Sequence, residues 1–165
     1  MSVTSFFQER VIFGKGIPDP VNVLLQEAAG NTNNFARAEQ LLLQAQRQAP
    51  DQLPVYTALY KLYFYNGHTD QAEDIVFQTL TKAALQGGFS YDWTKLQPQA
   101  EWANPDSPGR AYLYSLKALA FIRLRQDNPK SAQGILDTLR RLDPDDVIGA
   151  DVVRALANSM EDDDE

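Results

Sequence analysis

The sequence predicts an all-helical fold, on three observations. The chain of 165 residues is 44% hydrophobic, which is enough for one domain with a substantial core and too short for two independent ones. Gln, Ala and Leu, which favour helices, crowd the sequence, whereas the runs of Val, Ile and Thr that would mark strands are missing. Apolar residues also recur three and four positions apart, the spacing of an amphipathic helix.

The segment 56–80 shows this spacing most clearly, on both sides of the turn signal Asn66-Gly67. Before the turn, apolar residues at helical spacing predict one helix: Tyr56, Leu59, Tyr60 and Tyr63. After the turn, a second set predicts another: Ala72, Ile75, Val76 and Leu80. The segment is therefore expected to form a helix, a tight turn and a second helix.

The second helix of this pair has two counterparts in the chain. Each places small or large apolar residues at fixed offsets and two of the three end at a proline, which is common just beyond a helix. The three sets are Ala38, Leu42, Ala45 and Pro50; Ala72, Val76, Thr79 and Ala84; and Ala132, Leu136, Leu139 and Pro144. In the last of them, Asn128 and Pro129 are predicted to be the N-cap and the first helical residue.

A known repeat family has the period that separates Ala38 from Ala72, which are 34 positions apart. The chain resembles the tetratricopeptide repeat family at six positions that match its pattern in order: Tyr56, Leu59, Tyr63, Gly67, Ala72 and Val76. The third copy departs from the pattern, because Arg123 stands where the family has Tyr and Asp127 where it has the turn Gly. The resemblance implies a superhelical array of antiparallel helix pairs with terminal capping helices.

The resemblance divides the chain into one domain over residues 1–158 and an acidic tail over 159–165. Its parts are repeats at about 19–52, 53–84 and 113–144, an insert at about 85–110 and a capping helix at about 145–158. That last helix is expected to bury an apolar edge of Ile148, Val152 and Leu156. A matching N-terminal cap is expected within residues 1–14, where Phe6, Phe7, Val11 and Ile12 can share one face.

The insert carries both tryptophans, Trp93 and Trp102, which are expected to anchor it to the array. Three prolines rule out one continuous helix across it, and a short helix from Asp92 to Trp102 is expected inside it. Ser107 and Pro108 are predicted to be the cap and first residue of the next helix.

Charge and composition exclude several classes of function. The net charge of −7 includes −5 from the last five residues, so the rest of the chain carries −7 − (−5) = −2 and offers no basic stripe for nucleic acid. No run of apolar residues approaches the length of a membrane span, and no secretory signal is recognisable. We therefore expect a cytoplasmic protein with no nucleic-acid or membrane partner.

The sequence offers no set of residues for catalysis. It has no cysteine and a single histidine, His68, which is expected in the turn after Gly67. The common nucleophile and base pairs and nitrogen-rich metal sites are therefore missing, and no glycine-rich phosphate loop occurs. We expect no enzyme activity, no catalytic or metal-binding residues and no cofactor.

The resemblance instead implies a concave groove that binds a protein partner and is lined by the first helix of each pair. The residues expected on this groove are Thr57, Lys61, Phe64 and Tyr65 in the second repeat and Tyr114, Lys117, Phe121 and Leu124 in the third. Paired lysines and phenylalanines suit a peptide with an apolar side chain and a carboxylate. Packing against the insert or the N-terminal segment is an equal alternative for Phe64 and Phe121.

These observations predict a non-catalytic protein–protein interaction module that binds a peptide segment or helix of another protein, as an adaptor, assembly factor or chaperone. The alternative is a self-associating structural protein, a homodimer for instance. Its groove would then be filled by its own insert, its N-terminal segment or a second chain.

Overall fold

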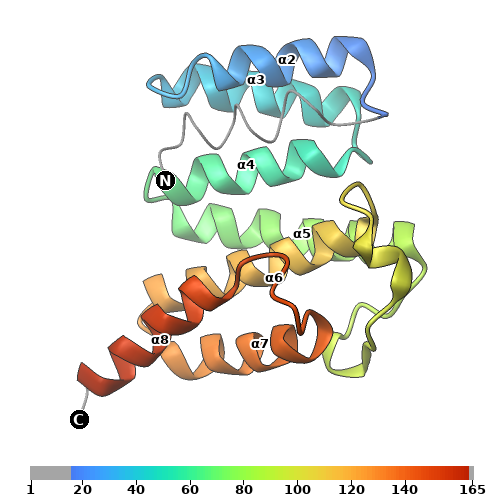
Figure 1. Cartoon of the computed structure of the whole chain (residues 1–165). Coiled ribbons are helices and arrows are strands. Elements are labelled where there is room, and N and C mark those ends of the chain that lie inside the picture. Colours follow the sequence, from blue (N-terminus) through green and yellow to red (C-terminus); the bar gives the residue numbers. More distant parts are fainter. Residues whose placement is uncertain (1–15, 164–165) are drawn as a thin grey trace. The chain divides into compact units, whose positions relative to one another are not determined.

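The structure of the protein is a computed structural model that describes residues 16–163, with side chains as far as Met160. Every regular element in this range is a helix, which confirms the all-α fold (Figure 1). The chain divides into two compact units, residues 1–79 and 80–165, and the boundary falls inside α5 (Thr69–Gly87). The N-terminal cap expected within residues 1–14 lies outside the described residues.

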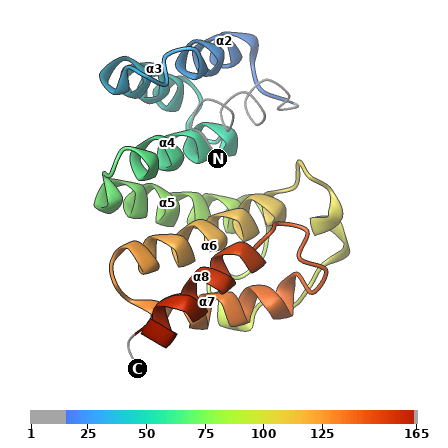
Figure 2. The ribbon, with the colours of Figure 1, turned by 60° about the vertical axis from the view of Figure 1, so that its left-hand side comes forward.

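The first unit contains α2 (Asp19–Ala29), α3 (Phe35–Gln48), α4 (Leu53–Tyr65) and the first part of α5. The middle helix, α3, packs against α2 on one side and α4 on the other (Figure 2). Their facing edges are completely buried and supply most of the core of this unit: Leu25, Ala28, Ala38, Leu42, Ala45, Val55, Leu59 and Leu62.

The second unit contains the rest of α5, two short 3-10 turns and three further helices. The turns are η1 (Trp93–Lys95) and η2 (Ala100–Ala103), and the helices are α6 (Pro108–Arg125), α7 (Pro129–Leu142) and α8 (Asp151–Asp163). The pair α6 and α7 packs closely, and α8 contacts both. The side chains that meet there are buried: Leu116, Leu119, Ile122, Leu136, Leu139, Val153 and Ala157.

The helices α3 and α7, one in each unit, begin and end in the same way. Both have 14 residues, and each begins after an asparagine, Asn34 or Asn128, whose side chain accepts the amide three residues on at 3.2 Å. Each ends before a proline, with the preceding residue, Ala49 or Asp143, outside the helical region. The predicted cap at Asn128 and the start at Pro129 are confirmed.

The last helix begins later than expected and buries a different edge. The capping helix predicted at 145–158 runs instead from Asp151 to Asp163, so it also takes in part of the expected tail. The side chains of Val152 and Leu156 are 73% and 41% exposed, whereas Val153 and Ala157 are buried. Of the expected edge, only Ile148 is buried, and it precedes the helix.

Two carboxylates hold the segment before α8 as a loop. The Asp143 carboxylate accepts hydrogen bonds from the backbone amides of residues 147 and 148, and the Asp146 carboxylate accepts hydrogen bonds from those of residues 150 and 151. Asp146 also has a φ of 52°, which ends any helix that includes it. Side-chain acceptors thus replace the backbone acceptors that a helix would have used.

The turns within the second and third helix pairs have the same backbone geometry, although the third lacks the glycine of the family pattern. Gly67 has a φ of 79° and Asp127 a φ of 59°, both in the left-handed region. The amide after Gly67 donates to the Tyr63 carbonyl and the amide after Asp127 to the Arg123 carbonyl, each at 2.8 Å. Asp127 therefore takes the backbone conformation that Gly67 adopts at less steric cost.

This turn geometry predicts opposite effects of two substitutions. Asp127→Gly should raise the free energy of unfolding by about 0.5–1 kcal/mol, because glycine adopts a positive φ without strain. Gly67→Ala should lower it by about 1 kcal/mol, for the converse reason. Chemical denaturation of both variants measures these changes. A less stable Asp127→Gly variant would mean that the aspartate side chain contributes more than its backbone costs.

Candidate functional site

The helix α4 has a buried side and a more open side. Tyr56, Leu59 and Tyr63 are at most 5% exposed and face the interior of the first unit. The expected groove residues of this helix lie off that stripe and form what we call the α4 face: Thr57, Lys61, Phe64 and Tyr65. The first three are half-buried and Tyr65 is 40% exposed. The inward stripe predicted for α4 is therefore buried, whereas a groove on its other side stays a prediction.

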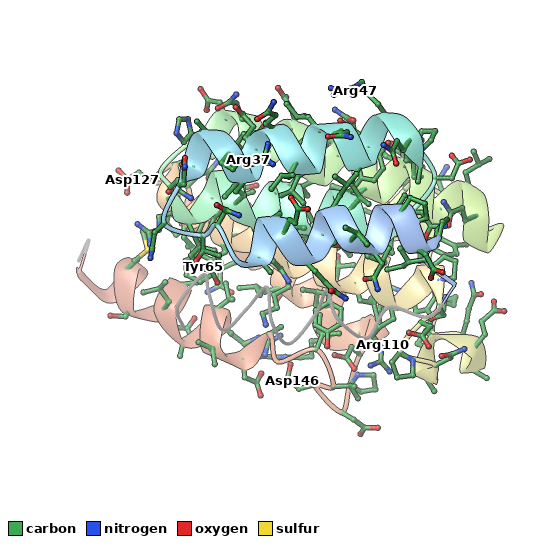
Figure 3. All side chains as sticks on the ribbon, turned by 90° about the horizontal axis from the view of Figure 1, so that it is seen from above. Arg37, Arg47, Tyr65, Arg110, Asp127 and Asp146 are labelled. Atoms are coloured by element: carbon green, nitrogen blue, oxygen red, sulfur yellow. The ribbon has the colours of Figure 1, made fainter. Side chains whose placement is uncertain are left out.

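The α4 face combines an aromatic edge with a positive charge. The rings of Phe64 and Tyr65 are 5.5 Å apart and meet at 79°, an edge-to-face contact that holds the exposed ring in place. Lys61 lies one turn earlier, with its Nζ 6.0 Å from the centre of the Tyr60 ring. Figure 3 places Tyr65 at the end of α4. Partial burial raises the pKa of its hydroxyl above the ordinary value.

The end of the buried side is braced by a second aromatic cluster. The His68 ring stacks on Phe35 at 4.5 Å with the planes 6° apart, and Phe35 also lies 6.1 Å from the Tyr63 ring. Burial raises the pKa of Tyr63 well above its usual range, and a hydrogen bond to Glu39 adds to the shift. His68, the only histidine of the chain, thus packs the turn after α4 onto α3.

The four groove residues expected on α6 differ from the α4 face in burial and in contacts. Tyr114 and Phe121 are half-buried, but Leu124 is only 4% exposed and belongs to the core of the second unit. The Lys117 ammonium donates to the Ile148 carbonyl at 3.0 Å and so holds the loop before α8. This lysine was expected to meet a carboxylate of a partner, which stays a prediction.

The eight expected residues therefore fall into two groups of four, each within one unit. Those on α4 lie in the first unit and those on α6 lie in the second. A groove that spans both groups stays a prediction. In the first unit, Val23 on α2 was not among the expected residues, although its large apolar side chain is 54% exposed. Its position in the sequence indicated this exposure, because Val23 lies outside the helical spacing that the buried Val21, Leu24 and Leu25 share.

The insert is packed onto α6, with Trp102 as its anchor. In place of the short helix expected from Asp92 to Trp102, it forms the turns η1 and η2, with extended backbone at Leu96 between them. Trp102 is 4% exposed and meets Phe89, whose ring in turn meets Tyr112 of α6 at 5.1 Å. Its indole nitrogen is buried and finds no hydrogen-bond partner in the part of the chain that the structure describes. Packing therefore holds this ring.

Two arginines fasten the insert by its backbone. Arg110 of α6 donates to the carbonyls of Trp102 and Ala103, each at 3.0 Å, and lies beside the insert in Figure 3. Arg141 of α7 donates to the carbonyls of Leu96 and Trp93. Neither arginine was among the expected site residues. The partners of Arg141 lie 45 and 48 positions away, so no local sequence pattern connects them.

The described residues hold no group of three His, Asp or Glu side chains that could bind a metal ion. Within the same range, none of the helices is both long and apolar enough to cross a membrane. Comparison of the chain with protein-family models, with curated proteins and with solved structures finds no match.

Two glycines in helices of the second unit give a matched test of the Trp102 anchor. A Cβ at Gly109 would stand 2.0 Å from the Trp102 ring, whereas one at Gly134 would meet nothing within 4 Å. Gly109→Ala should therefore displace the ring and lower stability by about 1–3 kcal/mol, the usual cost of overpacking a core. Gly134→Ala should raise stability by about 0.5–1 kcal/mol, because alanine favours a helix. Urea unfolding followed by tryptophan fluorescence compares the two.

Two buried tyrosines predict a loss of stability at high pH. Burial raises the pKa values of both Tyr63 and Tyr112, so their hydroxyls stay protonated in the folded chain after they ionise in the unfolded one. The contribution of this difference to the free energy of unfolding is fully present below the unfolded pKa of about 10. Above that pH the free energy of unfolding falls by about 1.4 kcal/mol per pH unit for each group. Denaturant unfolding between pH 8 and about 11 measures this slope, since both pKa values start from about 10.

The double variant Tyr63→Phe/Tyr112→Phe is the control for this slope, because it keeps both rings and removes both ionisations. It should lose most of the pH dependence. It should also be less stable at neutral pH by about 1 kcal/mol for each lost hydrogen bond, of which one joins the Tyr112 hydroxyl to the Tyr91 carbonyl. An unchanged slope in the variant would assign the effect to other groups.

Proposed function

We propose that the chain is a non-catalytic protein-binding module whose binding surface is centred on the α4 face. The observation that carries this proposal is an exposed aromatic ring, Tyr65, fixed against Phe64 and set one turn after a lysine. Aromatic anchors of this kind contribute strongly to protein interfaces, because they bury a large area at a small cost in conformational entropy.

The preferred ligand is a peptide segment or helix that combines an apolar side chain with a carboxylate. The apolar side chain would pack on the rings of Phe64 and Tyr65, and the carboxylate would approach the Lys61 ammonium. Helix pairs of the tetratricopeptide type, which the chain resembles, present such surfaces to extended segments of other proteins. Adaptor, assembly factor and chaperone are the roles that such a surface serves.

The α6 residues contribute less to this surface than the sequence alone predicts. The Lys117 ammonium already donates one of its hydrogen bonds to the Ile148 carbonyl, and the burial of Leu124 removes that side chain from contact with a ligand. Tyr114 and Phe121 stay half-buried and can extend the binding surface. We therefore place the main energetic contribution on α4.

A second candidate function is self-association through α8. Val152 and Leu156 stand four positions apart on one exposed edge of this helix, and Val147 in the preceding loop is 56% exposed. A second copy could cover this edge in a symmetric dimer. Sedimentation of the double variant Val152→Ser/Leu156→Ser against the wild type tests it, because dimers that persist in the variant contradict this interface.

Selection of peptides from a displayed random library, followed by affinity measurements on those selected, tests the α4 face. Peptides that bind the wild type should combine apolar and acidic residues. Tyr65→Ser should weaken their binding about tenfold, which corresponds to about 1.4 kcal/mol. Lys61→Glu should weaken it at least as much, and more so at low salt.

Two matched controls separate the site from general surface effects. Tyr91→Ser removes a similarly exposed tyrosine, 49% against 40%, from the second unit. Lys130→Glu reverses an exposed charge on α7. Neither control should change the affinity. Equal losses in the controls and in the α4 variants, or none in any, would contradict the proposal.

A further inference from the structure

The first unit exposes two large apolar side chains in its described part, Tyr65 on α4 and Val23 on α2. Tyr65 belongs to the α4 face, where Lys61 adds a positive charge beside the aromatic rings. A segment that covers this face therefore needs aromatic or aliphatic side chains together with a nearby carboxylate.

Residues 1–15 of the same chain have that composition. They include Phe6, Phe7, Val11 and Ile12, and the carboxylate of Glu9 lies between the two apolar pairs. Nothing else in the sequence outside the described residues offers an apolar segment, because residues 164 and 165 are both acidic.

The segment is joined directly to the first unit, just before α2. Gly16 has a φ of 76°, a left-handed turn conformation, only three positions before α2 begins. Fifteen residues can extend for about 50 Å, whereas the 13 residues of α4 span only about 20 Å. The short connection also gives the segment an effective concentration in the millimolar range near this unit.

We propose that residues 1–15 bind the α4 face of their own chain and compete there with the partner. Phe6, Phe7 and Ile12 supply the apolar contacts, and Glu9 approaches Lys61. The inference rests on the proposed function, since it assigns a regulation to the same surface. A partner then has to displace the segment, so its apparent affinity is reduced by the fraction of chains whose face is covered.

Disulfide trapping tests the location directly, because the chain contains no cysteine. Ser5→Cys combined with Thr57→Cys places one thiol in the segment and one on the α4 face, with both substitutions close to isosteric. Ser5→Cys with Gln40→Cys is the matched control, since Gln40 is exposed on α3 of the same unit. A disulfide forms only where the two Cβ atoms approach to about 4 Å.

In the full-length protein under mild oxidation, the α4 pair should form an intrachain disulfide about tenfold faster than the control pair. Adding Phe6→Ser, Phe7→Ser and Ile12→Ser should abolish that difference. Equal rates in the two pairs would overturn the proposal. Disulfide-linked dimers in place of intrachain bonds would also overturn it and would make a second copy of the chain the occupant.

A displayed peptide that binds the wild type separates this inference from the proposed function. With both correct, the cysteine-free chain carrying the three serine substitutions should bind that peptide about tenfold more tightly than the wild type. Trapping without any peptide that depends on Tyr65 would support the covered face and contradict the binding function. Peptide binding through Tyr65, without trapping and with equal affinity for the serine variant, would support the function and contradict the covered face.

Discussion

Each helix of this chain has an apolar edge that only a neighbouring helix can cover, and the fold depends on that constraint. In the first unit, α3 covers both of its neighbours, and Ala38, Leu42 and Ala45 on its edge are completely buried. The alanines allow the helix axes to approach closely, while the leucine fills the space between them. On α4 the completely buried residues follow one side of the helix, and the other side carries the half-buried Thr57, Lys61 and Phe64 and the exposed Tyr65.

The parts of the fold that were predictable from the sequence are those with local signals. The ends of α3 and α7 follow from an asparagine before the first turn and a proline after the last, and both act through the neighbouring backbone. The start of α8 was not predictable in this way. There Asp143 and Asp146 offer acceptors to four amides, and whether side chain or backbone accepts them depends on the packing of the loop that follows.

The candidate site shows the same division. Which residues of α4 face inward was predictable, because helical spacing alone separates Leu59 from Lys61. The role of Lys117 was not, since its carbonyl acceptor lies 31 positions away and belongs to a loop that was expected to be helical. The burial of Leu124 was not predictable for a related reason. Its burial depends on which elements cover α6, and periodicity within one helix does not identify them.

The attachment of the insert has a consequence for how its sequence can vary. Arg110 and Arg141 bind main-chain oxygen atoms, which every amino acid provides, and not the side chains of the residues they hold. The attachment depends on few side chains of the insert itself: the buried Trp102 and Leu96, Phe89, which packs on Trp102, and Gly109 and Arg110 where the insert joins α6. The other side chains of the insert can therefore be exchanged without loosening it. Such a segment is a natural place to graft foreign epitopes or recognition sequences.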